Sequence, residues 1–187
     1  MPKCIFLDGD GTLWYPSLTK RTDITHWIYL DPNTKDEYLK HLELCPGVYT
    51  ALSTLYMHGF QLILLSMSPK PEAEALQEHK EKLDYFNLTQ FFTSWHAAPA
   101  GDPESKPRII KDVLSQYGYK LHDAIMVGDS IKYDYQPVIE HGITSYLIES
   151  DWSPDADNLT TDTRQMQTIS EVADLLTLWN LSSQSTT

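Results

Sequence analysis

The sequence predicts an α/β fold built on a doubly wound, mostly parallel sheet. Short apolar runs that are typical of buried strands alternate along the chain with segments in which apolar residues recur at helical spacing. The runs are apolar throughout, as expected for parallel strands that helices cover on both faces. Acidic or hydroxyl residues follow several of these runs, and such sheets bind ligands beyond the carboxyl ends of their strands.

The N-terminal third is expected to contain one strand, an irregular insertion and one helix. Residues 3–7 (KCIFL) are a short apolar run that ends at an Asp-Gly pair, which indicates a buried strand. Residues 14–45 have no clean period, so we expect a flap or small insertion with a short helix near 37–42. From Val48 onward apolar residues recur at i, i+3, i+4 and i+7, and Gly59 ends this predicted helix.

The rest of the chain continues the alternation of strands and helices, within one predicted domain over residues 1–180. The further expected strands are residues 61–65, 91–93, 124–127 and 145–148. The further expected helices are residues 71–83, residues 107–118 and a last one that opens on a capping box of Thr168 and Glu171. Residues 94–107 are expected to form a loop, and residues 181–187 a disordered tail.

The charge of the chain excludes several classes of partner. Fourteen Lys and Arg stand against 26 Asp and Glu, which gives a formal net charge of −12. We therefore expect neither nucleic acid nor membrane as a partner, because both carry negative charge. No apolar run is long enough for a membrane helix and the N-terminus does not resemble a signal peptide, so we expect a cytoplasmic protein. An anionic substrate would require positive charge at the site itself.

Two carboxylates directly follow the first predicted strand. One Asp-Gly pair alone would indicate a turn, but Asp10 follows Asp8 at i+2, on the same side of an extended chain. Two carboxylates held this close repel each other unless a cation or a shared proton relieves the repulsion. Asp129 follows another predicted strand, and Asp134 comes five residues later. Acidic oxygens that converge in this way are typical ligands of Mg²⁺.

The same residues could carry out phosphoryl transfer to a carboxylate. Such a reaction needs an ionised nucleophile, and Asp8 can serve as one. It needs a metal ion, for which Asp129 is a ligand, and donors to the phosphoryl oxygens. It also needs an acid that protonates the leaving oxygen and later activates water, a role that suits Asp10. Ser66 and Lys106 are the candidate donors, and Lys106 supplies the local positive charge.

Each of these residues also has a simpler interpretation. Asp129 could cap a helix that starts at Ser130, although Asp8 and Asp10 favour the metal role. Lys106 could be a solvated surface lysine, but a cation is disfavoured at the start of a helix and so indicates an anionic partner there. Ser68 competes with Ser66 for the phosphate; we favour Ser66 because it directly follows the apolar run.

Four sequence motifs resemble those of the haloacid dehalogenase superfamily of phosphatases. The first is DGDGT, residues 8–12, and the second is LILLS, residues 62–66. The third is Lys106 with the proline that follows it, and the fourth is GDSIKYD, residues 128–134. The resemblance covers most of the chain and is poor over 14–45 and 151–168. The layout is similar to that of the small capless magnesium-dependent phosphatases of this superfamily.

The resemblance implies a Rossmann-like core and a role for each motif residue. Asp8 would be the nucleophile and a metal ligand, Asp10 the acid/base and a ligand through its backbone carbonyl, and Asp129 a ligand of Mg²⁺. Ser66, Lys106 and Thr12 would bind the phosphoryl group, although Thr12 could equally be a plain turn residue. Asp134 and Ser130 would support the site, Asp134 either through a water on the metal or by a salt bridge to Lys106.

The predicted function is hydrolysis of a phosphate monoester through an aspartyl-phosphate on Asp8, with Mg²⁺ as cofactor. In this family a carboxylate at the position of Asp10 is typical of phosphate ester chemistry. Between the first and the second motif there is room for only about 30 extra residues after Leu13, which is too few for a large cap domain. The site should therefore be open or covered by a flap, and could admit a phosphorylated small molecule or a phosphoprotein. The alternatives are a phosphotransferase of the same superfamily and a non-catalytic protein that binds a phospho-ligand.

Overall fold

A six-stranded sheet forms the centre of the molecule in a computed structural model that describes residues 2–23, 27–150 and 166–181. Every pair of neighbouring strands is parallel, and their order is β5-β4-β1-β6-β7-β8. The strands are β1 (Cys4–Leu7), β4 (Gln61–Ser68), β5 (Phe92–Pro99), β6 (Ala124–Gly128), β7 (Thr144–Ile148) and β8 (Thr168–Ile169). The predicted doubly wound α/β fold is confirmed.

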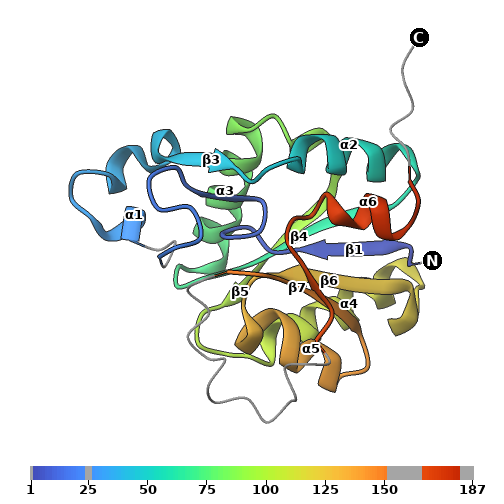
Figure 1. Ribbon diagram of the computed structural model, residues 1–187. Coiled ribbons are helices and arrows are strands. Elements are labelled where there is room, and N and C mark those ends of the chain that lie inside the picture. The colour runs from blue at the N-terminus through green and yellow to red at the C-terminus, as the bar shows by residue number, and fades with distance from the viewer. Residues whose placement is uncertain (1, 24–26, 151–165, 182–187) are drawn as a thin grey trace.

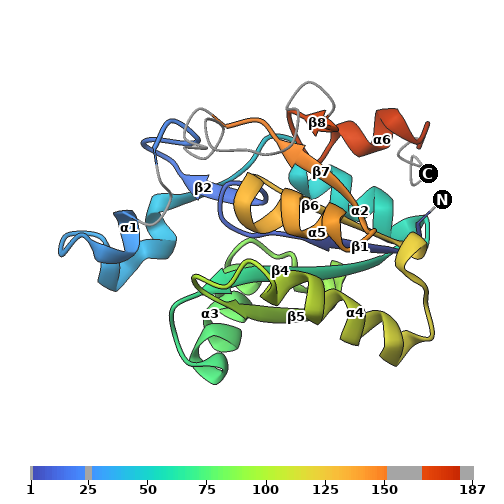
Figure 2. The ribbon, with the colours of Figure 1, turned by 90° about the horizontal axis from the view of Figure 1, so that it is seen from below.

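Helices cover both faces of this sheet (Figure 1). The helices on one face are α2 (Val48–Met57), α3 (Glu72–Tyr85) and α6 (Asp174–Leu178). The other face carries α4 (Ser105–Tyr117) and α5 (Gln136–Glu140), which lie in front of the sheet in Figure 2. Strand β1 is buried on both sides: Ile5 packs into the core under α2, and Phe6 into the core under α4. This two-sided burial explains why the central strands are continuous apolar runs.

The insertion between β1 and α2 forms a small substructure of its own. Strands β2 (Trp14–Pro16) and β3 (Leu42–Leu44) pair antiparallel at its base. Between them lie α1 (Trp27–Leu30) and a 3-10 helix, η1 (Lys35–His41), near the position of the predicted short helix. The insertion extends beyond the end of β1, on the left of Figure 1, which is the edge of the sheet where ligands are expected.

Two sequence-based expectations are wrong. Strand β5 begins in the strand that we expected at residues 91–93, but it continues to Pro99 through residues that we expected to be a loop. An edge strand pairs on one side only, so its half-exposed side chains need not be apolar. The expected capping box is absent, since Thr168 lies in β8 and the backbone N–H groups of Ser170 and Glu171 donate to the carboxylate of Asp174. Of the expected tail, residues 182–187 lie outside the described residues.

None of the helices in the described part of the chain is both long and apolar enough to cross a membrane.

Candidate active site

The register of the central strands brings the predicted site residues to one edge of the sheet. Leu7 of β1 lies beside Leu64 of β4 on one side and Val127 of β6 on the other. The residues that follow these three therefore emerge together at the carboxyl end of the sheet. Asp8 follows Leu7 directly, and its backbone N–H donates to the carbonyl of Val127 at 2.9 Å. Asp129 directly follows Gly128, the last residue of β6.

Three carboxylates are buried together at this edge. Asp8, Asp129 and Asp134 are 6%, 3% and 1% exposed, and one carboxylate oxygen from each lies within 4.8 Å of the others. Burial, together with the charges of Asp8 and Asp134, raises the pKa of Asp129 well above its usual value. Burial also raises the pKa of Asp134 to about 6, against the opposing effect of Lys106. This concentration of negative charge requires a compensating cation.

Lys106 supplies part of that compensation. It lies in the first turn of α4, is 1% exposed, and its Nζ donates to Asp8 Oδ1 at 2.5 Å and to Asp134 Oδ1. Burial lowers the pKa of Lys106, but the neighbouring Asp134 and Asp8 outweigh burial and raise it above its usual value, so the ammonium is charged. Of the two roles expected for Asp134, the structure has the salt bridge to Lys106. A buried lysine at a helix start is thus explained by its anionic partners.

The donor set fits a divalent cation. Asp129 Oδ2 is buried and has no hydrogen-bond partner among the described residues, which is costly for a carboxylate oxygen unless a cation binds there. Three carboxylates with one ammonium leave the cluster with a net negative charge when all are ionised. Carboxylate oxygens are hard ligands of the kind that Mg²⁺ prefers. Asp8, Asp129 and Asp134 could therefore hold or surround a magnesium ion.

Two glycines are required by the close packing of these carboxylates. Gly11 has a φ of +80°, and a Cβ at this position would overlap the carboxylate of Asp129. A Cβ at Gly128 would overlap the side chain of Asp134 in the same manner. The glycines of the first and fourth motifs thus let the acidic side chains approach the backbone.

Asp10 lies next to this cluster, and residues outside the cluster hold one of its carboxylate oxygens. Its Oδ1 accepts hydrogen bonds from Trp14 Nε1 at 2.6 Å and from Tyr29 Oη at 2.8 Å. The Nζ of Lys82 lies 3.7 Å from the same oxygen. Asp10 does not belong to the group of carboxylates described above, so its side chain is not among the converging oxygens.

The three hydroxyl residues near the site, Ser66, Ser68 and Thr12, differ in their hydrogen-bond partners. Ser66 is 6% exposed and lies within β4, which continues to Ser68. Ser68 Oγ accepts a hydrogen bond from the backbone N–H of Lys70, so this serine serves the turn after the strand. Thr12 is fully buried, and its Oγ1 has no hydrogen-bond partner in the described ranges. An unpartnered buried hydroxyl is available to a ligand.

Ser130, and not Asp129, caps the helical turn of the fourth motif. Its Oγ accepts from the backbone N–H of Tyr133 at 3.3 Å, at the start of the helical turn Ile131–Tyr135. Its own N–H donates to Asp134 Oδ2 at 3.0 Å, which orients that carboxylate. The simpler interpretation of Asp129 as a helix cap is therefore wrong.

Three residues near the site were not predicted from the sequence: Arg21, Tyr29 and Lys82. One signal was available for Lys82, because it shares the buried face of α3 with Ala75 and Leu83, where an apolar residue would be expected. Arg21 and Tyr29 lie in the insertion, which has no period from which to infer their orientation.

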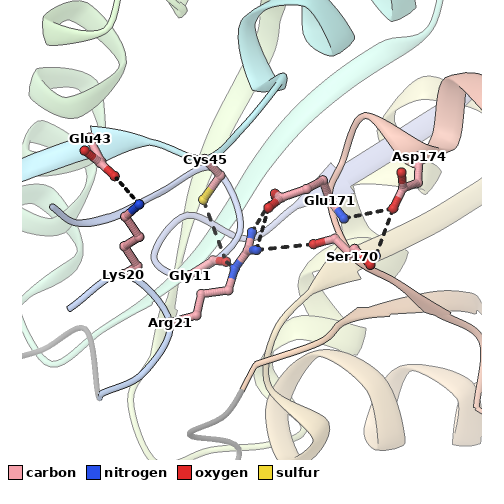
Figure 3. Close-up of polar contacts among 8 residues, drawn as sticks. All are labelled: Gly11, Lys20, Arg21, Glu43, Cys45, Ser170, Glu171 and Asp174. Atoms are coloured by element: carbon pink, nitrogen blue, oxygen red, sulfur yellow. Dashed lines mark hydrogen bonds and ion pairs between the residues drawn. The ribbon is translucent and has the colours of Figure 1, made fainter. Parts of the chain in front are cut away.

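Arg21 ties the insertion to the loop of the first motif and to the C-terminal segment (Figure 3). Its Nε donates to the carbonyl of Gly11 at 2.7 Å. Its two terminal nitrogens donate to the two oxygens of Glu171, each at 2.8 Å, and one also donates to the carbonyl of Ser170 at 3.2 Å. Because Gly11 packs against Asp129, Arg21 stabilises the loop that contacts this carboxylate.

Arg21→Met should lower the free energy of unfolding by about 2–4 kcal/mol, because it leaves the carboxylate of Glu171 without this donor and the carbonyl of Gly11 with only the weak contact of Cys45 Sγ. Urea denaturation measures the change. Arg108→Met removes an exposed pair with Asp102 and is the matched control, expected to cost less than about 1 kcal/mol. Equal losses in the two variants would contradict the structural role of Arg21.

Comparisons with known proteins agree with this geometry. The family model for haloacid dehalogenase-like hydrolases matches residues 16–142, which is more than half of the chain. A search of curated proteins gives no match. A D,D-heptose 1.7-bisphosphate phosphatase from B. bronchiseptica, solved with magnesium and phosphate, superposes with a TM-score of 0.68 at 15% identity, over 95% of this chain and 98% of that one.

Two further solved structures share the fold. A HAD phosphatase from Thermococcus onnurineus has a TM-score of 0.63 at 17% identity, over 96% of this chain and 99% of that one. An uncharacterized protein from Listeria monocytogenes serotype 4b has a TM-score of 0.68 at 18% identity, again over 96% and 99%. The matched family range includes three of the four motifs on which the resemblance was inferred, and the first motif precedes it. The chain belongs to the haloacid dehalogenase-like hydrolase family.

Proposed function

We propose that the protein is a magnesium-dependent phosphomonoester hydrolase that acts through a covalent phosphate on Asp8. The observation that carries this proposal is the buried Asp8 carboxylate, paired with the Lys106 ammonium beside Asp129, whose Oδ2 has no partner among the described residues. A carboxylate at the carboxyl end of a parallel sheet is suited to attack the phosphorus of an anionic phosphate ester when an ammonium lies beside it and a neighbouring carboxylate can bind a metal ion.

In the first step, one oxygen of Asp8 attacks phosphorus and the bond from phosphorus to the ester oxygen breaks. Lys106 holds Asp8 in one orientation and offsets the charge that accumulates on the phosphoryl oxygens. Asp8, Asp129 and the backbone carbonyl of Asp10 would hold the Mg²⁺, and Asp134 would hold Lys106 in place. When bound, the ion supplies positive charge that lets a carboxylate approach a phosphate dianion.

Asp10 would move the protons. As the ester bond breaks, protonated Asp10 gives its proton to the leaving oxygen. The resulting carboxylate then takes a proton from the water whose oxygen attacks the phosphorus of the aspartyl-phosphate, which frees Asp8 and inorganic phosphate. Ser66 and Thr12 would donate to the phosphoryl oxygens. The hydroxyl of Thr12, which has no hydrogen-bond partner among the described residues, supports such a role.

The substrate is proposed to be a phosphorylated small molecule or a phosphoprotein. The described part of the chain between β1 and α2 forms only short elements, so the insertion can act as a flap but not as a large cap. The similar phosphatase solved with magnesium and phosphate supports phosphate ester chemistry for this fold.

Asp8→Asn should lower turnover of p-nitrophenyl phosphate by about 10³-fold or more, because an amide oxygen is a poor nucleophile toward phosphorus. The rate is measured with saturating Mg²⁺ as phosphate and p-nitrophenol release. Asp84→Asn removes an exposed carboxylate on α3 and is the matched control, expected to retain wild-type rates. Wild-type turnover by the Asp8→Asn variant would exclude Asp8 as the nucleophile.

Asp10→Asn should slow hydrolysis of the covalent intermediate by about 10²- to 10⁴-fold, since the attacking water loses its general base. With p-nitrophenyl phosphate the variant should release a rapid burst of about one p-nitrophenol per enzyme, followed by slow turnover. Rapid-mixing absorbance measures both phases. A variant with no burst and undiminished steady-state turnover would remove Asp10 from the reaction.

Mg²⁺ should stabilise the folded protein, by about 2.7 kcal/mol at a concentration 100-fold above its Kd. Thermal unfolding with and without Mg²⁺ measures this effect without any substrate. Asp129→Asn should lose most of the response, yet be at least as stable as the wild type without the ion, because it relieves repulsion among buried carboxylates. An equal response to Mg²⁺ in the variant and in the wild type would contradict the assignment of Asp129 as a ligand.

A further inference from the structure

Two hydrogen-bond donors and one ammonium contact the carboxylate of Asp10, all at the same oxygen. Trp14 comes from β2 and Tyr29 from α1, and their Nε1 and Oη donate to Asp10 Oδ1 at 2.6 and 2.8 Å. The ammonium of Lys82, on α3, lies 3.7 Å from that oxygen. Within the described parts of the chain, the hydrogen bonds and the ion pair of this carboxylate all involve Oδ1. Residues from three elements, β2, α1 and α3, therefore fix the orientation of one side chain.

Lys82 is buried in an unusual environment. It is 3% exposed, and its Nζ lies 4.4, 5.6 and 5.9 Å from the ring centroids of Tyr29, Tyr38 and Trp14. Lysines are almost never fully buried unless they are paired, and the electron-rich faces of aromatic rings stabilise a cation in such a position. The aromatic residues of the insertion thus hold a positive charge beside Asp10.

Glu78, the other acidic partner of Lys82, offsets only part of its positive charge. Lys82 Nζ lies 2.9 Å from Glu78 Oε1, but the other oxygen of Glu78 pairs with Lys70 Nζ at 2.6 Å. Glu78 is therefore shared between two lysines. Lys70, Glu78, Lys82 and Asp10 form a row of alternating charges that leads from the surface to the candidate active site.

We propose that Lys82 and Tyr29 are positioning residues for Asp10, which direct its Oδ2 toward the reacting groups. Because donors occupy Oδ1, this oxygen remains an acceptor and the transferable proton binds Oδ2. Oδ2–H then gives its proton to the leaving oxygen as the ester bond breaks, and the same oxygen later takes a proton from the attacking water. This inference rests on the proposed function of Asp10 as acid and base.

The inference gives the insertion a part in the chemistry. Trp14 and Tyr29 belong to it, so the segment between β1 and α2 helps to fix the orientation of the acid. Without Lys82 or the hydroxyl of Tyr29, fewer contacts hold the Asp10 side chain, so its orientation is less tightly fixed. Misplacement of a catalytic group by about 1 Å can cost about 10²-fold in rate.

The test compares two substrates that differ in their need for an acid. The p-nitrophenolate ion leaves without a proton, whereas the alkoxide of glycerol 2-phosphate must be protonated as it departs. Lys82→Met should lower kcat/KM for glycerol 2-phosphate by about 10- to 100-fold, and for p-nitrophenyl phosphate by less than about threefold. Tyr29→Phe, which removes one hydroxyl, should give the same selective loss to a smaller degree and serves if Lys82→Met fails to fold.

The Asp10→Asn background provides the second arm. If Lys82 acts through Asp10, Lys82→Met should cause no further loss for glycerol 2-phosphate in that background, within about twofold. Lys80→Met, on the exposed side of α3, is the matched control and should leave both substrates at wild-type rates. Circular dichroism establishes that each variant is folded.

The outcomes separate the two proposals. Selective loss with glycerol 2-phosphate that disappears in the Asp10→Asn background supports the positioning role. If the wild type is active and Lys82→Met and Tyr29→Phe lower both substrates equally, lower neither, or cause the same loss with and without Asp10, the positioning role is overturned and the phosphatase assignment stands. If the wild type hydrolyses neither substrate, the proposed function fails and the inference fails with it.

Discussion

The Lys106 ammonium lies between two buried carboxylates, those of Asp8 and Asp134, and the arrangement of the whole site depends on this contact. Three carboxylates at the end of a sheet would repel one another and take up protons. The ammonium offsets part of this charge, and Asp129 keeps one oxygen that has no hydrogen-bond partner in the part of the chain that the structure describes. When all these groups are ionised, the three carboxylates and one ammonium keep a net negative charge, which favours binding of a divalent cation. Because charges buried in this manner cost stability, the arrangement is better explained by chemistry than by folding.

The rest of the fold serves to bring these charges together. Parallel pairing of β1 with β4 and β6 carries Asp8, Ser66 and Asp129 to one edge, and the start of α4 delivers Lys106 to the same place. Gly11 and Gly128 leave the space into which the carboxylates pack. The insertion adds a second layer of control, since it contributes Trp14 and Tyr29 to the surroundings of Asp10 and Arg21 to the carbonyl of Gly11. A segment without any sequence period therefore touches the first motif at several points.

The sheet and the acidic cluster could be predicted from the sequence because both leave local signals. Strands buried on two faces are apolar throughout, and the strand ends mark where Asp8 and Asp129 emerge. Only the start of β5, within residues 91–93, could be predicted, because an edge strand need not be apolar and the half-exposed side chains of its remainder are typical of a loop. The surroundings of Asp10 escaped prediction, because Tyr29 and Lys82 meet only through tertiary contacts between the insertion and α3. The partner of Asp134 was left open between metal and lysine, since the spacing of the fourth motif does not fix where its side chain points.

The central claim is that Asp8 becomes covalently phosphorylated during turnover. Rapid acid quenching of the protein during reaction with p-nitrophenyl phosphate and Mg²⁺, followed by peptide mass spectrometry, measures this directly. The account predicts one phosphoryl group on the peptide that contains Asp8, bound to that carboxylate and present in greater amount when Asp10 is replaced by Asn. Continued turnover with no phosphorylated peptide in that variant, or with the phosphoryl group on another residue, would contradict it.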